Sequence, residues 1–124
     1  MSVLYESPHD GNFILSEDNE GRLSRDNIVI ASGAGALRPG TVLGKLTASD
    51  KFVPSPETAA DGSETASAVL VGHVDATDAD ALAVGLMRHA EVSRHGLIYD
   101  ATVDDDPKKS AKWDQLRAAG IMVR

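Results

Sequence analysis

The residue types in this chain that could carry out chemistry are its histidines and its carboxylates. There are four histidines, His9, His73, His89 and His95, 19 acidic residues and no cysteine. The histidines lack the paired spacing of a zinc site. The absence of cysteine excludes thiol catalysis and thiolate metal ligands. His73 stands in an apolar run, which favours a hydrogen-bonded strand histidine over a ligand.

The carboxylates do not form a recognisable metal or catalytic motif either. Asp75, Asp78 and Asp80 suggest calcium, but a calcium loop read from Asp78 places Leu82 and Ala83 where an oxygen ligand and a glycine are needed. We therefore expect solvated loop carboxylates there. Since no pair of carboxylates stands out as acid and base, we expect no catalytic residues and no metal site.

Two short motifs partly match a nucleotide-binding site and a catalytic nucleophile. In each case the neighbouring residues do not complete the pattern. Gly33-Ala34-Gly35 begins like a dinucleotide-binding fingerprint, but Arg38 occupies the third glycine position and no helix pattern follows. Ser63 lacks the G-x-S-x-G pattern of a hydrolase nucleophile. We expect turn glycines, and no cofactor.

Composition limits the partners of the chain. The 124 residues fit one domain, and the net charge of −7 disfavours direct binding to nucleic acid. No apolar run approaches the roughly 20 residues of a membrane span, and the N-terminus does not resemble a signal peptide. The expectation is a soluble protein that is made in the cytoplasm and does not bind a membrane.

The centre of the chain predicts a β-meander between Asn27 and Pro54. Three short strands are expected, at residues 27–31, 41–47 and 51–53. Arg38-Pro39-Gly40-Thr41 suits a type II turn, because proline fixes φ at its second position and glycine accepts a positive φ at its third.

Residues 1–26 are predicted to form a flexible N-terminal arm, followed by a single β-rich domain at residues 27–124. The arm is polar except for two apolar islands, Val3-Leu4-Tyr5 and Phe13-Ile14-Leu15. Its composition alone is typical of a disordered or loosely attached tail. The apolar islands favour a second interpretation, an arm that is ordered as an extended strand against a partner.

The second half of the chain predicts further strands and then one helix. Residues 55–65 are expected to form an exposed loop and residues 66–74 a buried strand. Residues 81–92 fit either a strand or a helix, and we favour a strand because a short connection suits a hairpin. Asp106 is expected to cap a helix with Pro107 in its first position, Gly120 to end it, and residues 121–123 to form a last strand.

Several segments together resemble the head decoration proteins of tailed bacteriophages, the lambda-type protein D family. The likeness extends over nearly the whole chain from Phe13, and the order and spacing of the segments are more specific than any one of them. Residues 20–23 depart from it, since they form a longer turn than the family pattern has. The matching segments are 13–17, 24–27, 31–35, 39–44, 61–66, 74–77, 88–92 and 116–124.

The resemblance implies a compact α/β (α+β, mostly β) domain of the β-clip type, with a small C-terminal helix and an extended N-terminal arm. It also implies a non-enzymatic homotrimer on the outer surface of the virion. Such a trimer would bind the major capsid protein at three-fold sites of the expanded head and stabilise the head against internal DNA pressure.

By the same resemblance, residues 2–17 would face the shell, with the contacts made by Val3, Leu4, Tyr5, Phe13, Ile14 and Leu15. The alternative is a small β-clip or barrel enzyme or a ligand-binding module, which would need a concave pocket with converging polar groups.

Overall fold

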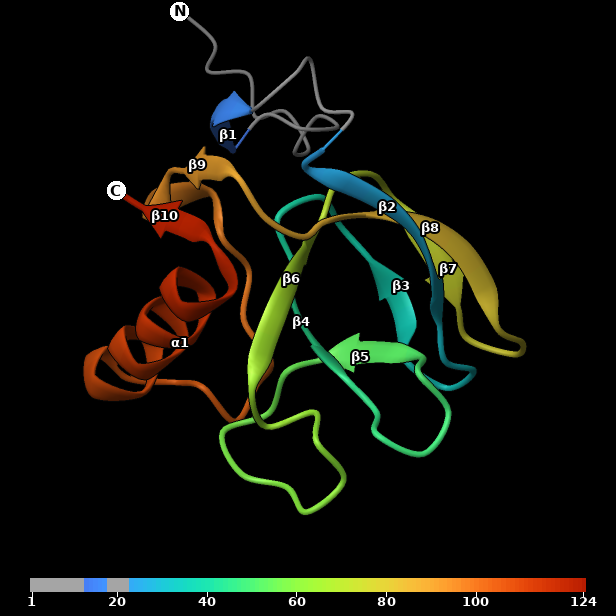
Figure 1. The fold of residues 1–124 in the computed structure, drawn as a ribbon. Helices are drawn as coiled ribbons and strands as arrows, with labels where there is room; N and C mark the ends of the chain where they lie inside the picture. The colour runs from blue at the N-terminus through green and yellow to red at the C-terminus, as the bar shows by residue number, and fades with distance from the viewer. Residues whose placement is uncertain (1–12, 18–22) are drawn as a thin grey trace, which may run out of the picture.

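The structure is a computed structural model and describes residues 13–17 and 23–124. Ten strands, a single turn of 3-10 helix (Arg94–Gly96) and one α-helix follow each other along this part of the chain (Figure 1). The strands and the helix are β1 (Ile14–Glu17), β2 (Arg25–Ile30), β3 (Gly35–Leu37), β4 (Val42–Lys45), β5 (Phe52–Pro54), β6 (Ala66–Leu70), β7 (Val74–Ala76), β8 (Ala81–Leu86), β9 (Ala90–Val92), α1 (Asp106–Ala119) and β10 (Ile121–Val123).

The strands form three sheets. Five of them close into a barrel in the order β2-β5-β4-β6-β8, so that this barrel has no open edge. Strands β1, β9 and β10 form a separate sheet, which we call the terminal sheet, and β3 pairs with β7 in a two-stranded sheet. Figure 1 shows the terminal sheet above α1 on one side of the molecule and the β2–β8 ribbon on the other. The expectation of a mostly β domain with a C-terminal helix is confirmed.

Small aliphatic side chains fill two adjoining cores. One lies inside the barrel around Ile30, Leu43 and Leu70. The other lies between the barrel, α1 and the terminal sheet, around Leu86, Leu116 and Ile121. The chain has few aromatic residues, and only two of them are phenylalanines, Phe13 and Phe52. Each phenylalanine is buried in one of these cores.

The predicted meander is wrong in its strand order. The three strands exist, as β2, β4 and β5, and β4 and β5 pair antiparallel as expected. However, β5 lies between β2 and β4, pairs with β2 in parallel, and separates it from β4. Residues 32–41, which include β3, form a long crossover in place of a hairpin turn. Within it, the turn at Arg38–Thr41 is confirmed: Gly40 has φ of 95°, and the Thr41 amide donates to the Arg38 carbonyl at 3.2 Å.

The ambiguous residues 81–92 are strands, as favoured, and they divide into β8 and β9. The helix also forms where it was expected, although Asp105 is the capping residue, not Asp106. The Asp105 carboxylate accepts the Lys108 amide at 3.0 Å, and Pro107 is the second helical residue. Gly120 ends the helix with φ of 99°, and β10 follows directly.

The predicted strand over residues 66–74 is too long. It ends at Leu70, and β7 begins at Val74 after a break. His73 falls in this break and is exposed, which corrects the expectation of a histidine within a strand.

No helix in the described ranges is long and apolar enough to span a membrane.

Candidate functional surface

The terminal sheet brings together the two ends of the described chain. Strand β9 is central, with β1 antiparallel on one side and β10 parallel on the other. The predicted contact residues Phe13, Ile14 and Leu15 lie at its β1 edge. Val3, Leu4 and Tyr5 lie outside the described residues.

The three described residues of the predicted contact set have different environments. Phe13 is 4% exposed and belongs to the core beneath the terminal sheet, and Ile14 packs against the same core. Leu15 is 55% exposed, because the register between β1 and β9 shifts between Ile14 and Ser16 and turns Leu15 outward. Of these three residues, only Leu15 offers a large apolar surface to a partner.

The two edges of the terminal sheet differ in their availability for another strand. On β10, Arg124 makes both of its backbone hydrogen bonds to the β9 side, so the carbonyl of Val123 faces away from β9. The Arg117 guanidinium donates to that carbonyl at 3.2 Å and covers this edge. On β1, the edge away from β9 has no strand partner in the described part of the chain. Within residues 13–17 and 23–124, the β1 edge is therefore the open one.

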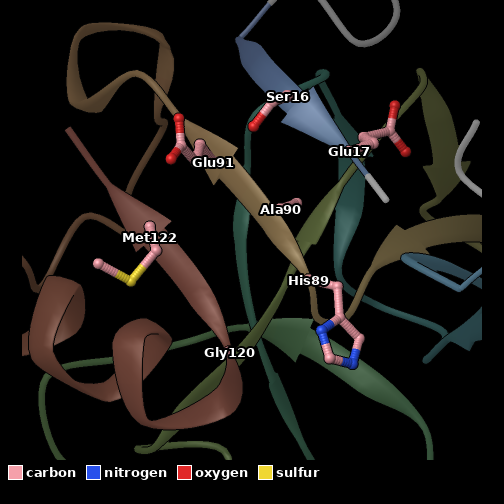
Figure 2. A pocket seen from close by; sticks show the side chains of 7 residues that line it. All are labelled: Ser16, Glu17, His89, Ala90, Glu91, Gly120 and Met122. Atoms are coloured by element: carbon pink, nitrogen blue, oxygen red, sulfur yellow. The ribbon is translucent and has the colours of Figure 1, made fainter. Parts of the chain in front are cut away.

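The outer face of the terminal sheet is a shallow groove of about 470 Å³. Ser16, Glu91 and Met122 stand side by side on β1, β9 and β10 in this face (Figure 2). Met122 is 41% exposed and adds apolar surface to this groove. The residues that line the groove are Ser16, Glu17, His89, Ala90, Glu91, Gly120 and Met122.

An ion pair ties this sheet to the barrel. Arg25, the first residue of β2, donates two hydrogen bonds to Glu17 at the end of β1, at 2.7 and 2.5 Å. These bonds hold the pKa of the Glu17 carboxyl below its ordinary value of 4.5. Arg124 makes a similar contact with Glu91 at 3.0 Å on the outer face. Both carboxylates are thus paired with arginines. A general acid would need the opposite of what Glu17 has, a carboxyl with a raised pKa.

The sequence analysis missed one buried charge, Lys112 on the inner face of α1, which is 2% exposed. Its ammonium donates to Ser55 Oγ at 2.9 Å and to the carbonyls of Pro56 and Glu64 at 2.6 Å each. Burial lowers the pKa of Lys112, while the surrounding carboxylates act in the opposite direction. The only signal in the sequence was its spacing of four residues from the buried Leu116.

The same interaction corrects the expectation of a wholly exposed loop at residues 55–65. Ser55 and Ser63 are buried, and Ser55 Oγ donates to the Ser63 carbonyl at 2.7 Å. The loop is pinned to α1, and its remaining exposed residues lie at its tip, on the side of the molecule away from the terminal sheet (Figure 1).

The motif residues considered for chemistry have structural places in the fold: Gly33 lies in a turn, Gly35 begins β3, and Asp75 lies in β7. Gly33 and Gly35 both have positive φ, at 91° and 88°, as turn glycines do. Asp75 accepts from Thr77 in a local turn, and Asp80 pairs with Lys51. Within residues 13–17 and 23–124, no three histidine or acidic side chains are grouped so as to hold a metal ion.

Comparison with known proteins gives the family. Residues 3–121, nearly the whole chain, match the family described as Bacteriophage lambda head decoration protein D. No match was found among curated proteins. The family is structural, so the alternative of a small enzyme is set aside. The chain belongs to the bacteriophage lambda head decoration protein D family, whose members sit on the outer surface of the phage capsid.

Proposed function

We propose that this chain binds as a trimer at three-fold sites of the expanded phage head, and that residues 2–17 face the shell and contact the major capsid protein. Bound there, the trimer cements neighbouring capsomers and stabilises the head against the pressure of the packaged DNA. Membership of the decoration family supports binding to the capsid; the trimer, the three-fold site and the contact residues are our proposal.

The observation that carries the proposal is the open edge of β1. Strand β1 begins at Ile14, just after residues 1–12, and its outer edge has no strand partner among the described residues. Backbone hydrogen bonds to an added strand supply affinity, and side chains on alternating faces supply specificity. Because Arg117 covers the opposite edge of the terminal sheet, strand addition is directed to the β1 side.

Within this proposal, the apolar residues have two roles. Val3, Leu4, Tyr5 and Leu15 supply contacts to the shell. Phe13 and Ile14 pack in the chain's own core and fix the point from which the arm departs. A firm anchor matters, because an arm that is held at its root loses less conformational freedom on binding.

Symmetry and avidity explain how weak arms could stabilise a head. Three arms on one trimer engage one lattice, so the second and third contacts form at a high effective concentration. If the binding sites exist only in the expanded shell, the trimer stabilises that state by its differential affinity.

The test is a truncation that leaves the domain intact. Removing residues 1–12 spares Phe13 and β1, and we expect the truncated protein to keep the thermal stability of the full chain and lose co-sedimentation with empty expanded heads. The full chain and a variant with the order of residues 2–12 scrambled serve as controls. Unchanged binding by the truncated protein would refute the role of the arm. Failure of the full chain to bind would refute the proposal that this protein decorates expanded heads.

A further inference from the structure

The outer face of the β2–β8 ribbon is an exposed apolar ridge. The register places Val29 beside Leu82 and Asn27 beside Val84, all on the face away from the barrel core. Leu82 is 84% exposed and Val84 is 37% exposed, and none of these four residues is charged. Leu82 and Val84 therefore present neighbouring apolar side chains to the outside, a surface that a second protein chain can cover.

A second feature on a neighbouring side of the chain is a groove along the β3–β7 sheet, which we call the β3–β7 groove. It has a volume of about 400 Å³, and its walls are mostly apolar, supplied by Ala36, Leu37 and Val74. Arg38, His73 and Asp75 form its rim. A groove of this size accommodates a leucine side chain.

The ridge and the groove are adjacent. His73 lines the β3–β7 groove and also a depression beside Leu82 and Val84. In a closed ring of three, the two contact surfaces of a subunit face its neighbours at an angle of about 60°, so they must lie on adjacent sides of the chain. Surfaces on opposite sides would produce an open filament instead.

The charges at the two surfaces are complementary. Arg38, on the rim of the β3–β7 groove, is exposed and forms no ion pair with any described residue. Asp78, four residues before Leu82, is exposed and likewise forms no ion pair within the described ranges. A ridge that enters the groove of a second copy would bring Asp78 towards Arg38, on a rim that also carries Asp75.

We propose that the occupant of the β3–β7 groove is Leu82 of a second copy of this chain, and that three such contacts close the trimer. This inference rests on the trimer of the proposed function and assigns its subunit contact. The contact is heterologous: Leu82 and Val84 of one protomer meet Ala36, Leu37 and Val74 of the next, and Asp78 lies opposite Arg38. It leaves the terminal sheet free for the capsid.

The test is the oligomeric state of the full chain by analytical ultracentrifugation. We expect the wild type to be a trimer, and Leu82→Asp to raise the concentration of half-dissociation by about tenfold or more. Leu23→Asp is the matched control, because Leu23 is 49% exposed and lies outside the ridge. Circular dichroism confirms folding, and Leu82→Ser replaces Leu82→Asp if the charged variant unfolds.

A charge exchange tests the pairing of the two surfaces. Arg38→Asp and Asp78→Arg should each weaken the trimer, and the double variant should restore it, because the charges are then complementary again. A Leu82→Asp protein that stays trimeric, a wild type that is monomeric or dimeric, or a double variant weaker than both single variants would overturn the inference. Binding of the wild type to expanded heads is measured separately, so that loss of this contact and failure of decoration are distinguishable.

Discussion

The ammonium of Lys112 donates a hydrogen bond of 2.9 Å to the hydroxyl of Ser55, across 57 residues of sequence. The same nitrogen donates to the carbonyls of Pro56 and Glu64, so one side chain of α1 satisfies three acceptors, buried or partly buried, at both ends of the 55–65 loop. The charge of the lysine is costly to bury, and these three hydrogen bonds offset that cost.

Replacing Lys112 with methionine should therefore destabilise the domain. The apolar stem is kept, but three acceptors, one buried and two partly buried, lose their donor, and we expect a loss of about 3 kcal/mol in the free energy of unfolding. Urea unfolding measures the loss. Lys109→Met, at a partly exposed position of the same helix, is the control and should cost under about 1 kcal/mol. Equal stability of the two variants would contradict the role given to Lys112.

Gly44 in β4 should not tolerate a side chain. A Cβ there would overlap the backbone of Ser63, with its carbonyl carbon only 2.7 Å away, and Ser63 is held in place by Ser55. We expect Gly44→Ala to cost about 2 kcal/mol or more, by displacing the 55–65 loop. Gly33→Ala is the comparison: its surroundings are open, and only its positive φ of 91° costs energy, about 1 kcal/mol. A smaller loss at Gly44 than at Gly33, by thermal or urea unfolding, would be inconsistent with this packing.

Phe13 and Leu15 should separate stability from capsid binding. Phe13→Ala removes a buried ring, and we expect a loss of about 3 kcal/mol in unfolding free energy. Leu15→Ala should leave stability within about 0.5 kcal/mol, since the side chain is exposed, and should weaken binding to expanded heads. Calorimetry and head co-sedimentation measure the two effects. Strong destabilisation by Leu15→Ala would place Leu15 in the core and remove it from the contact set.

The Glu17–Arg25 pair should make stability depend on pH in acid. Because the folded pKa of Glu17 lies below its ordinary value of 4.5, the pair stabilises the fold above that value, and its contribution is lost as the pH falls through the folded pKa. Glu17→Gln should therefore be less stable than the wild type at pH 6, by up to about 1 kcal/mol, with the difference disappearing towards pH 3.

Urea midpoints at several pH values test this dependence. Glu57→Gln is the control, since Glu57 is exposed and forms no ion pair among the described residues. A difference between wild type and Glu17→Gln that persists unchanged at pH 3 would show that the effect does not come from ionisation of Glu17.

Local sequence patterns were enough to predict the turns and the helix, because these elements depend mainly on neighbouring residues. Pro39-Gly40 specified a turn, because proline restricts φ and glycine accepts a positive φ. The helix was also specified locally, since the segment from Asp105 to Gly120 contains its capping residue, its proline and the glycine that ends it. The helix boundaries were therefore predicted to within one residue. The mostly β character also followed from short apolar runs between turn residues. The ordered series of matching segments indicated the family.

Only the tertiary structure decided which strands pair and which polar groups are buried. The insertion of β5 between β2 and β4 closes a barrel, and closure depends on the packing of distant strands, which no local pattern encodes. From the sequence alone Lys112 would be expected to face solvent, because its hydrogen-bond acceptors lie 48 to 57 residues away along the chain. Phe13 and Leu15 belong to one apolar island, and a register shift between Ile14 and Ser16 places one in the core and leaves the other exposed. The physical reason is the same in each case: long-range packing selects among local alternatives that are close in free energy.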